Sequence, residues 1–155
     1  MKKTVVAGVA AAGLAAFPAL APADTAPVAT VKADLAKLQS NVATARTTLV
    51  GDAQKLAADA NAAKGTSRKA ARAAIKPDLQ KLHSDLAAAR ATIKADHAQL
   101  RSDLAAAKQV KGAAKELKPV LASTRASVKQ LRSEIRSELA KARQAVKDLR
   151  ASFTK

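Results

Sequence analysis

The sequence predicts an all-α fold, an elongated antiparallel three-helix bundle or coiled coil built from three copies of one helical repeat. Shifting residues 31–64 by 44 positions onto 75–108 gives 16 identities in 34 positions, and only four of these match Ala to Ala. A more diverged third copy starts at Leu117. The chain has five Gly, five Pro, 1% aromatic residues and no Cys, a composition that disfavours a β-sandwich or an α/β enzyme.

Apolar residues recur in each copy at steps of four and three, which is the spacing of one helix face. These three apolar seams share one four-residue stutter at the same place, and only His97 and Thr124 are not apolar. The seams are Val31, Leu35, Leu38, Val42, Ala45, Leu49, Ala53, Leu56, Ala60 and Ala63; Ile75, Leu79, Leu82, Leu86, Ala89, Ile93, His97, Leu100, Leu104 and Ala107; and Leu117, Leu121, Thr124, Val128, Leu131, Ile135, Leu139, Ala142, Val146 and Leu149.

The N-terminal residues 1–23 have the layout of a secretory signal peptide. Lys2 and Lys3 precede an uncharged run over residues 4–16, and small residues end at Ala23, after which we expect cleavage. An apolar run of about 13 residues is shorter than the roughly 20 needed to span a bilayer, and the mature chain contains no transmembrane candidate. We therefore expect an exported protein, which is extracellular, cell-surface associated or periplasmic. Cleavage leaves 26 basic and 12 acidic residues, a net charge of +14.

Residues 24–30 are expected to form a short extended linker, and residues 31–155 the three-helix bundle. Its helices are predicted at about 28–64, 67–111 and 113–153. Gly65 and Gly112 follow the first two seams, where a helix C-cap favours a residue that tolerates positive φ. Ser67 is expected to cap the second helix. Pro77 and Pro119 predict kinks or late starts in the second and third helices.

Short turns marked by glycine make neighbouring helices antiparallel. The expected arrangement resembles spectrin-type bundles in architecture only, because the sequence carries no family motif. Many seam positions are Ala, and each missing branched side chain forgoes about 1.5–3 kcal/mol of burial. We therefore expect a monomer of low stability, or stability gained by self-association into a homo-oligomer.

Charged residues flank each apolar seam in a fixed order. The position after a seam residue is often basic, and the position before it is often acidic, as in Asp78, Asp85, Asp96 and Asp103. Charges beside a seam ordinarily give modest pairing energies, which would be a sufficient explanation. Antiparallel neighbours, however, place like edges together. One interface between consecutive helices should therefore have a basic rim and the other an acidic rim, and the sequence leaves open which is which. Parallel contacts between molecules would instead pair opposite edges and favour an oligomer.

The positive charge is concentrated in the second and third helices. Residues 24–65 carry +1, residues 66–111 carry +6 and residues 112–155 carry +7. These helices are where we expect an anionic partner to bind. The candidate anion-binding residues are Arg68, Arg72, Lys76, Arg90, Lys94, Arg101, Lys108, Arg125, Lys129, Arg132, Arg136, Arg143, Lys147 and Arg150.

Catalysis and metal binding have little support in the sequence, and we predict no enzyme activity, no metal site and no cofactor. His83 and His97 are 14 residues apart on one helix, about 21 Å, which is too far to share a metal ion. A protein of charge +14 would attract an anionic polymer or surface, such as cell-wall polymer, anionic polysaccharide, extracellular DNA or anionic lipid. Sequence-specific nucleic-acid binding is not expected, because aromatic stacking residues are missing. The alternative is a structural or oligomerising coiled-coil spacer without a dedicated anion site.

Overall fold

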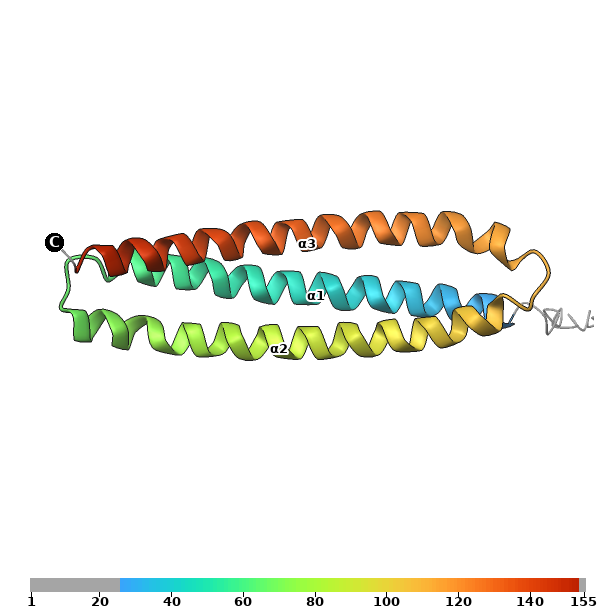
Figure 1. The fold of residues 1–155 in the computed structure, drawn as a ribbon, viewed down its shortest axis with the longest axis horizontal. Coiled ribbons are helices and arrows are strands. Elements are labelled where there is room, and N and C mark those ends of the chain that lie inside the picture. The colour runs from blue at the N-terminus through green and yellow to red at the C-terminus, as the bar shows by residue number, and fades with distance from the viewer. Residues whose placement is uncertain (1–25, 154–155) are drawn as a thin grey trace, which may run out of the picture.

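The computed structural model describes residues 26–153, which form three long α-helices and no strand. They are α1 (Ala26–Ala62), α2 (Arg68–Ala107) and α3 (Ala113–Ala151). The helices lie side by side in a rod about 60 Å long, with a reversal of direction at each connection (Figure 1). As a result, α1 and α3 run parallel to each other, and α2 runs antiparallel to both. The predicted signal peptide lies outside the described residues.

Residues 26–30 of the predicted extended linker 24–30 are helical, which corrects that part of the prediction. The helix begins at Ala26, with Pro27 in its first turn, where the missing N–H of proline has no intrahelical partner to lose. Val28 and Val31 are buried in the core. Burial of these two apolar side chains favours helix over an extended chain in this segment.

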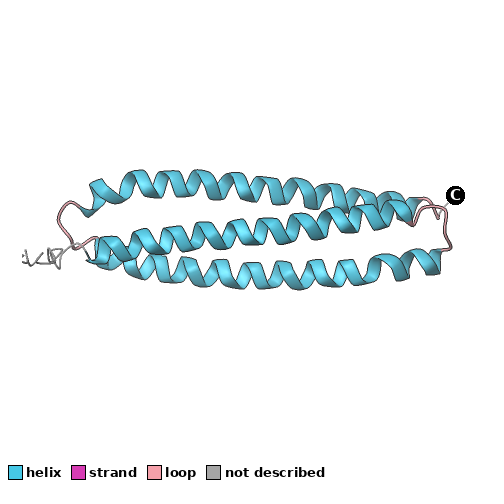
Figure 2. Ribbon diagram, turned by 180° about the vertical axis from the view of Figure 1, so that it is seen from behind, coloured by secondary structure: helices cyan, strands magenta, loops and turns pink. Residues whose placement is uncertain are grey.

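The two connections lie at opposite ends of the rod (Figure 2). Ser67 is the N-cap of α2, as predicted, and its hydroxyl accepts a hydrogen bond from the backbone N–H of Ala70 at 3.2 Å. Gly65 and Gly112 both have positive φ, +84° and +86°. Gly112, however, is the N-cap residue of α3 rather than the C-cap of α2. The second helix ends at Ala107, before the predicted residue 111, because residues 108–111 form the turn that reverses the chain.

The late helix starts expected at Pro77 and Pro119 are not observed. Both prolines lie inside their helices, which begin at Arg68 and Ala113. Each proline removes the N–H that would bond to the carbonyl four residues earlier, on Ala73 or Lys115. Both of those residues are exposed, so water can satisfy the free carbonyl.

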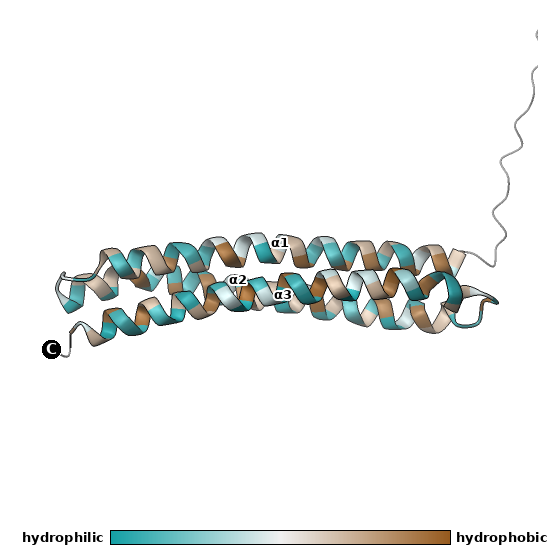
Figure 3. Ribbon diagram, turned by 90° about the horizontal axis from the view of Figure 1, so that it is seen from above, coloured by the Kyte–Doolittle hydropathy of each residue, from teal (hydrophilic) through white to brown (hydrophobic). Residues whose placement is uncertain are grey.

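The helix α1 is the centre of the packing. It packs against both α2 and α3, whereas α2 and α3 make little direct contact with each other. In Figure 3, α1 accordingly lies on one side of the rod and the other two helices on the opposite side. The matching seam residues Leu35, Leu79 and Leu121 show the consequence, because Leu35 is 2% exposed while Leu79 and Leu121 are only half-buried.

The core is divided into two clusters at the two ends of the rod. One cluster joins the start of α1 to the end of α2 and the start of α3, with Leu38 and Leu117 among its members. The other joins the end of α1 to the start of α2 and the end of α3, with Leu56 and Leu149 among its members. Between them Ala45 and Ala89 are half-buried, and these small side chains leave the middle of the rod thinly packed.

Candidate anion-binding groove

The acidic edges of α1 and α2 face each other across their antiparallel interface. Lysines from both helices bridge them, so that Nζ of Lys81 lies 2.6 Å from Asp52 and Nζ of Lys55 lies 2.7 Å from Asp78. Asp96, whose side chain is 5% exposed, accepts a hydrogen bond from Nδ2 of Asn41 at 2.7 Å. The acidic interface is therefore the one between α1 and α2, and cations span it.

These ion pairs change the pKa values of the groups involved. The carboxylates of Asp59 and Asp78 accept hydrogen bonds from Lys55 and raise its pKa. The hydrogen bond from Lys55 in turn lowers the pKa of Asp59. In the same way, a hydrogen bond from Lys81 lowers the pKa of Asp85. These interactions hold the carboxyl groups in their ionised form.

Asp34 shows the opposite behaviour at the same interface. Its pKa is raised because a hydrogen bond to Asp103 needs a proton on one of the two carboxyl groups, and because burial disfavours its charge. Oδ2 of Asp34 is buried and lacks a hydrogen-bond partner among the described residues. A proton shared with Asp103 would supply that missing bond.

The parallel interface between α1 and α3 pairs opposite charges. Nζ of Lys32 lies 3.0 Å from Glu116, and Nε of Arg46 lies 2.8 Å from Glu134. The basic edge of α1 is thus matched by the acidic edge of α3. Together with the α1–α2 interface, this contact places most of the acidic groups near α1.

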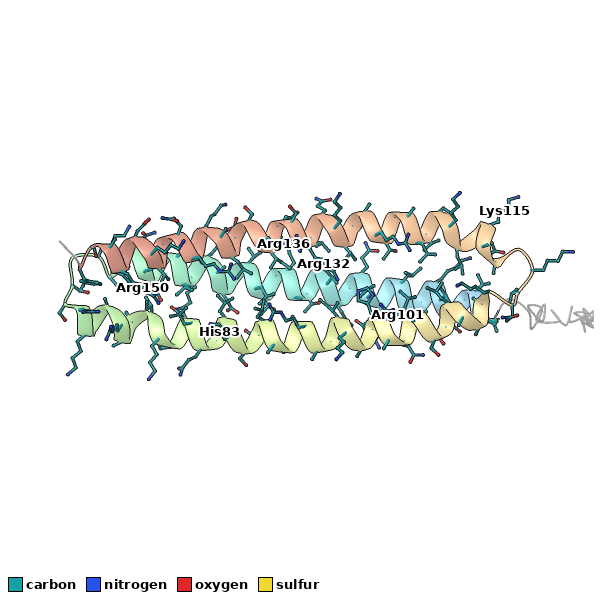
Figure 4. All side chains as sticks on the ribbon, in the orientation of Figure 1. His83, Arg101, Lys115, Arg132, Arg136 and Arg150 are labelled. Carbon is teal, nitrogen blue, oxygen red and sulfur yellow. The ribbon has the colours of Figure 1, made fainter. Side chains whose placement is uncertain are left out.

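A basic groove remains between α2 and α3. In the half of the rod that holds the turn between α2 and α3, it forms a cavity of about 430 Å³, with Leu35 and Leu38 of α1 among the lining residues. Its basic lining residues are Arg101, Arg125, Lys129, Arg132 and Arg136. Figure 4 shows Arg132 and Arg136 on the side of α3 that faces α2. Nη2 of Arg132 reaches across and lies 3.4 Å from Nε2 of His97.

A second cavity of about 940 Å³ lies where α2 begins and α3 ends. Arg68, Arg72 and Lys76 line it from α2, and Arg150 lines it from the end of α3. Figure 4 shows Arg150 between α3 and α2, toward the end of the rod opposite Lys115, and His83 on α2. The antiparallel arrangement therefore brings together cations that are more than 70 residues apart in the sequence.

Three other predicted residues line two further hollows on α2 and α3. Arg90 and Lys94 line a shallow one of about 610 Å³, and Lys108 lines one of about 560 Å³ at the turn between the two helices. Arg143 and Lys147 line none of these four cavities. The structure thus gathers twelve of the fourteen predicted residues along the groove.

The predicted cations also form no ion pair with an acidic side chain of the described residues. Within residues 26–153, the basic members of ion pairs are Lys32, Lys37, Arg46, Lys55, Lys81 and Lys141. None of the fourteen candidate residues belongs to this set. Their positive charge is therefore available to a ligand.

Sequence reasoning missed three groove residues. Lys118 follows the seam residue Leu117 and lines the hollow at the turn. His83 also follows a seam residue, and it lines the cavity where α2 begins and α3 ends. Phe153 lies beyond the last seam residue and lines the same cavity. The position-after-seam rule would have found Lys118 had it been applied to every seam residue. The same rule places His83 on the basic edge, but as an exposed side chain without a binding role. No periodic signal marks Phe153.

No group of three or more acidic, His or Cys side chains among residues 26–153 is arranged to hold a metal ion. None of the three described helices has a stretch that is long and apolar enough to cross a bilayer.

Comparison with known proteins does not assign the groove. No protein-family model, no curated protein and no solved structure matches this chain. The function has to be argued from the charges and shape of the groove itself.

Proposed function

We propose that this chain is an exported, non-enzymatic helical protein that binds polyanions along the groove between α2 and α3. One observation carries the proposal. Cations line both walls of the groove without an acidic partner among the described residues, while the ion pairs lie elsewhere. A ligand with repeated anionic groups would neutralise this charge along the rod.

The electrostatic argument depends on like charges held close together. Guanidinium and ammonium groups on two packed helices repel one another, and this repulsion raises the free energy of the unliganded fold. Lys94 and Arg101 are seven residues apart on α2. On α3, Arg125 and Arg132 are seven residues apart, and so are Lys129 and Arg136. Each step is about 10.5 Å along a helix, so the cations form two extended rows rather than one point. An elongated anionic polymer or surface matches such rows, and its counterions gain entropy when they are released.

Chromatography of the mature protein on immobilised heparin tests the proposal. One variant carries four Gln replacements in the groove, at Arg125, Lys129, Arg132 and Arg136. This variant is expected to elute from heparin at clearly lower salt concentration. For a DNA fragment, the slope of the logarithm of the binding constant against the logarithm of salt concentration should be shallower by about three to four.

A charge-matched variant provides the control. Lys64, Lys69, Lys111 and Lys115 are exposed, make no ion pair among the described residues and line none of the four cavities. Lys115 lies at the end of the rod, away from the groove walls (Figure 4). Their replacement by Gln removes the same charge and should change elution much less. Equal effects of the two variants would mean diffuse attraction and would contradict a groove site.

The second candidate function is a structural spacer that assembles through coiled-coil contacts. The half-buried seam residues of α2 and α3, such as Leu79 and Leu121, favour it because another helix could cover them. Light scattering over a wide concentration range separates the candidates. A monomer at all concentrations supports the groove as a ligand site, whereas a defined oligomer supports the spacer.

The proposal includes a common origin of the three helices as copies of one coiled-coil repeat. The 16 identities between residues 31–64 and 75–108 support it, as does the burial of most seam positions on α1. A chimaera in which the exposed face of residues 78–92 receives the matching residues of 34–48 should keep its helix content by circular dichroism. Loss of helix content in that chimaera would argue against equivalent copies.

A further inference from the structure

The cavity where α2 begins and α3 ends has an apolar floor and, at about 940 Å³, is about twice as large as the cavity of about 430 Å³ that Arg132 lines. Ile75 and Leu79 of α2 face Leu149 and Phe153 across it. Leu79 and Phe153 are only half-buried, although both pack against the core cluster at this end. Apolar side chains thus remain partly exposed to solvent at the bottom of a cavity of about 940 Å³.

The rim of this cavity is cationic. Arg68, Arg72 and Lys76 follow one another at four-residue steps on one face of α2, and Arg150 stands on α3. None of the four forms an ion pair among residues 26–153. From Ala71 to Leu79 the floor extends for about 12 Å along α2. An elongated apolar surface is therefore bordered by positive charge.

Charge and polarity together select the occupant. A second copy of this chain would bring its own basic groove, and like charges would oppose its docking here. A polyanion without an apolar part would neutralise the rim but leave the floor in contact with water. An anion with one acyl chain satisfies both the cationic rim and the apolar floor. Its head group binds the cations of the rim, and its chain covers Leu79 and Phe153.

We propose that this end of the groove binds a single-chain anionic amphiphile, with a carboxylate or phosphate head group at the cationic rim and the acyl chain along the apolar floor. The inference rests on the proposed function, since it uses the same unpaired cations. It adds that the ligand at this end is recognised by its chain as well as by its charge.

Titration calorimetry of the mature protein with dodecanoate, below the concentration at which it forms micelles, tests the inference. One dodecanoate per chain is expected. Decanoate should bind about tenfold more weakly, because two buried methylene groups are lost. The Phe153→Ala variant should weaken dodecanoate binding about three- to tenfold, and combined replacement of Arg68, Arg72 and Lys76 by Gln about tenfold.

Two controls isolate the cavity. Combined replacement of Arg125, Lys129 and Arg132 by Gln removes the same charge from the other part of the groove and should leave dodecanoate binding unchanged. Dodecyl maltoside carries the same chain on an uncharged head group and should not bind measurably. Every substituted residue is exposed or half-buried in the folded protein, so the variants are expected to fold, and circular dichroism verifies this.

Several outcomes would overturn the inference. Equal binding of the maltoside would mean an apolar patch that does not select charge, and insensitivity to both cavity variants would place the dodecanoate elsewhere. Binding to vesicles of anionic phospholipid without binding of monomeric dodecanoate would mean a membrane surface instead. If dodecanoate fails to bind while heparin still retains the protein, the inference falls and the proposed function stands. If heparin retention is lost as well, both fall.

Discussion

At the scale of single residues, two glycines with equally open surroundings are expected to respond differently to replacement by alanine. Gly51 lies inside α1, and a Cβ atom added there would meet no heavy atom within 4 Å. Gly65 has equally open surroundings, but its φ of +84° is a conformation that L side chains rarely adopt. Backbone conformation, rather than space, therefore distinguishes the two glycines.

Replacement of Gly51 by Ala is expected to stabilise the protein by about 1 kcal/mol, because Ala has the higher helix propensity and restricts the unfolded chain. Thermal unfolding followed by circular dichroism at 222 nm measures the change. Gly65→Ala provides the control and should destabilise by about 1 kcal/mol, through strain at positive φ. A neutral or destabilising Gly51→Ala variant would show that residue 51 is not in regular helix.

Asp34→Asn should raise the free energy of unfolding at pH 7 by up to about 1 kcal/mol, since the Asn amide can donate a hydrogen bond to Asp103 without a shared proton. A carboxyl group whose pKa is raised by folding stabilises the fold only at low pH, and this stabilisation is lost as pH rises through the raised pKa. The benefit of Asn should therefore vanish below about pH 3, where Asp34 is protonated. Chemical denaturation at pH 7 and pH 3 checks this, with the exposed Asp148→Asn as control.

At the scale of helices, the same apolar spacing leads to different burial according to which neighbours a helix has. The seam of α1 contacts two helices and is almost completely buried, whereas the seams of α2 and α3 mainly contact α1. The α1–α2 interface adds ion pairs in which exposed lysines cover carboxylates that are partly or fully buried. The stability of the rod should therefore depend on α1 more than on either other helix.

Leu56→Ala and Leu79→Ala make this difference measurable. Leu56 is 2% exposed, and its truncation should cost about 3 kcal/mol through lost burial and a cavity. Leu79 is half-buried in the wall of the groove, and its truncation should cost about 1 kcal/mol. Urea denaturation gives both values. Equal costs would indicate that the groove beside Leu79 is closed in solution.

Acidification should destabilise the fold through the ion pairs that Lys55 and Lys81 make with Asp59 and Asp85. Hydrogen bonds from Lys55 and Lys81 lower the pKa values of Asp59 and Asp85 in the folded state. A group with a lowered pKa contributes stability above its unfolded pKa of about 4, and this contribution is lost as pH falls through the folded pKa. The melting temperature should therefore decline below about pH 4. In the Lys55→Gln, Lys81→Gln double variant the decline should be shallower.

At the scale of the whole molecule, the distribution of charge is uneven around the rod. Ion pairs surround α1, while the groove between α2 and α3 holds cations without acidic partners among the described residues. Repulsion across this groove opposes the packed state, and ions in solution screen it. The same imbalance that destabilises the free protein would favour an anionic ligand.

Raising the ionic strength from about 10 to about 300 mM should increase the melting temperature, because screening relieves about 1 kcal/mol of repulsion, or about 3–6 °C. The variant with Arg125, Lys129, Arg132 and Arg136 replaced by Gln should melt higher at low salt and respond less to added salt. Differential scanning calorimetry measures both effects. A melting temperature that falls with salt would mean that ion pairs, not the groove, dominate the electrostatic free energy.

The sequence by itself determined the helices, most of the buried positions and twelve of the cations that line the cavities of α2 and α3. Helix period, Ser67 and the two glycines at the connections are local signals, because they depend on hydrogen bonds and sterics between residues close in the chain. The same local signals misplaced the start of α1 and the effect of Pro77. The start of α1 depends on the burial of Val28, and the tolerance of Pro77 inside α2 depends on the access of water to the carbonyl of Ala73. Both depend on tertiary packing, which the neighbouring residues in the sequence do not specify.

Only the tertiary structure decided which helices share an interface and which charges remain unpaired. The alternation of acidic and basic edges allowed either interface between consecutive helices to be the basic one. The packing of both α2 and α3 against α1 assigns the acidic edges to α1–α2 and leaves the basic edges of α2 and α3 facing each other. It also brings Phe153 and Arg68 to the lining of the same cavity. Such choices depend on the rotation of each helix about its axis, a global property that helical periodicity does not specify.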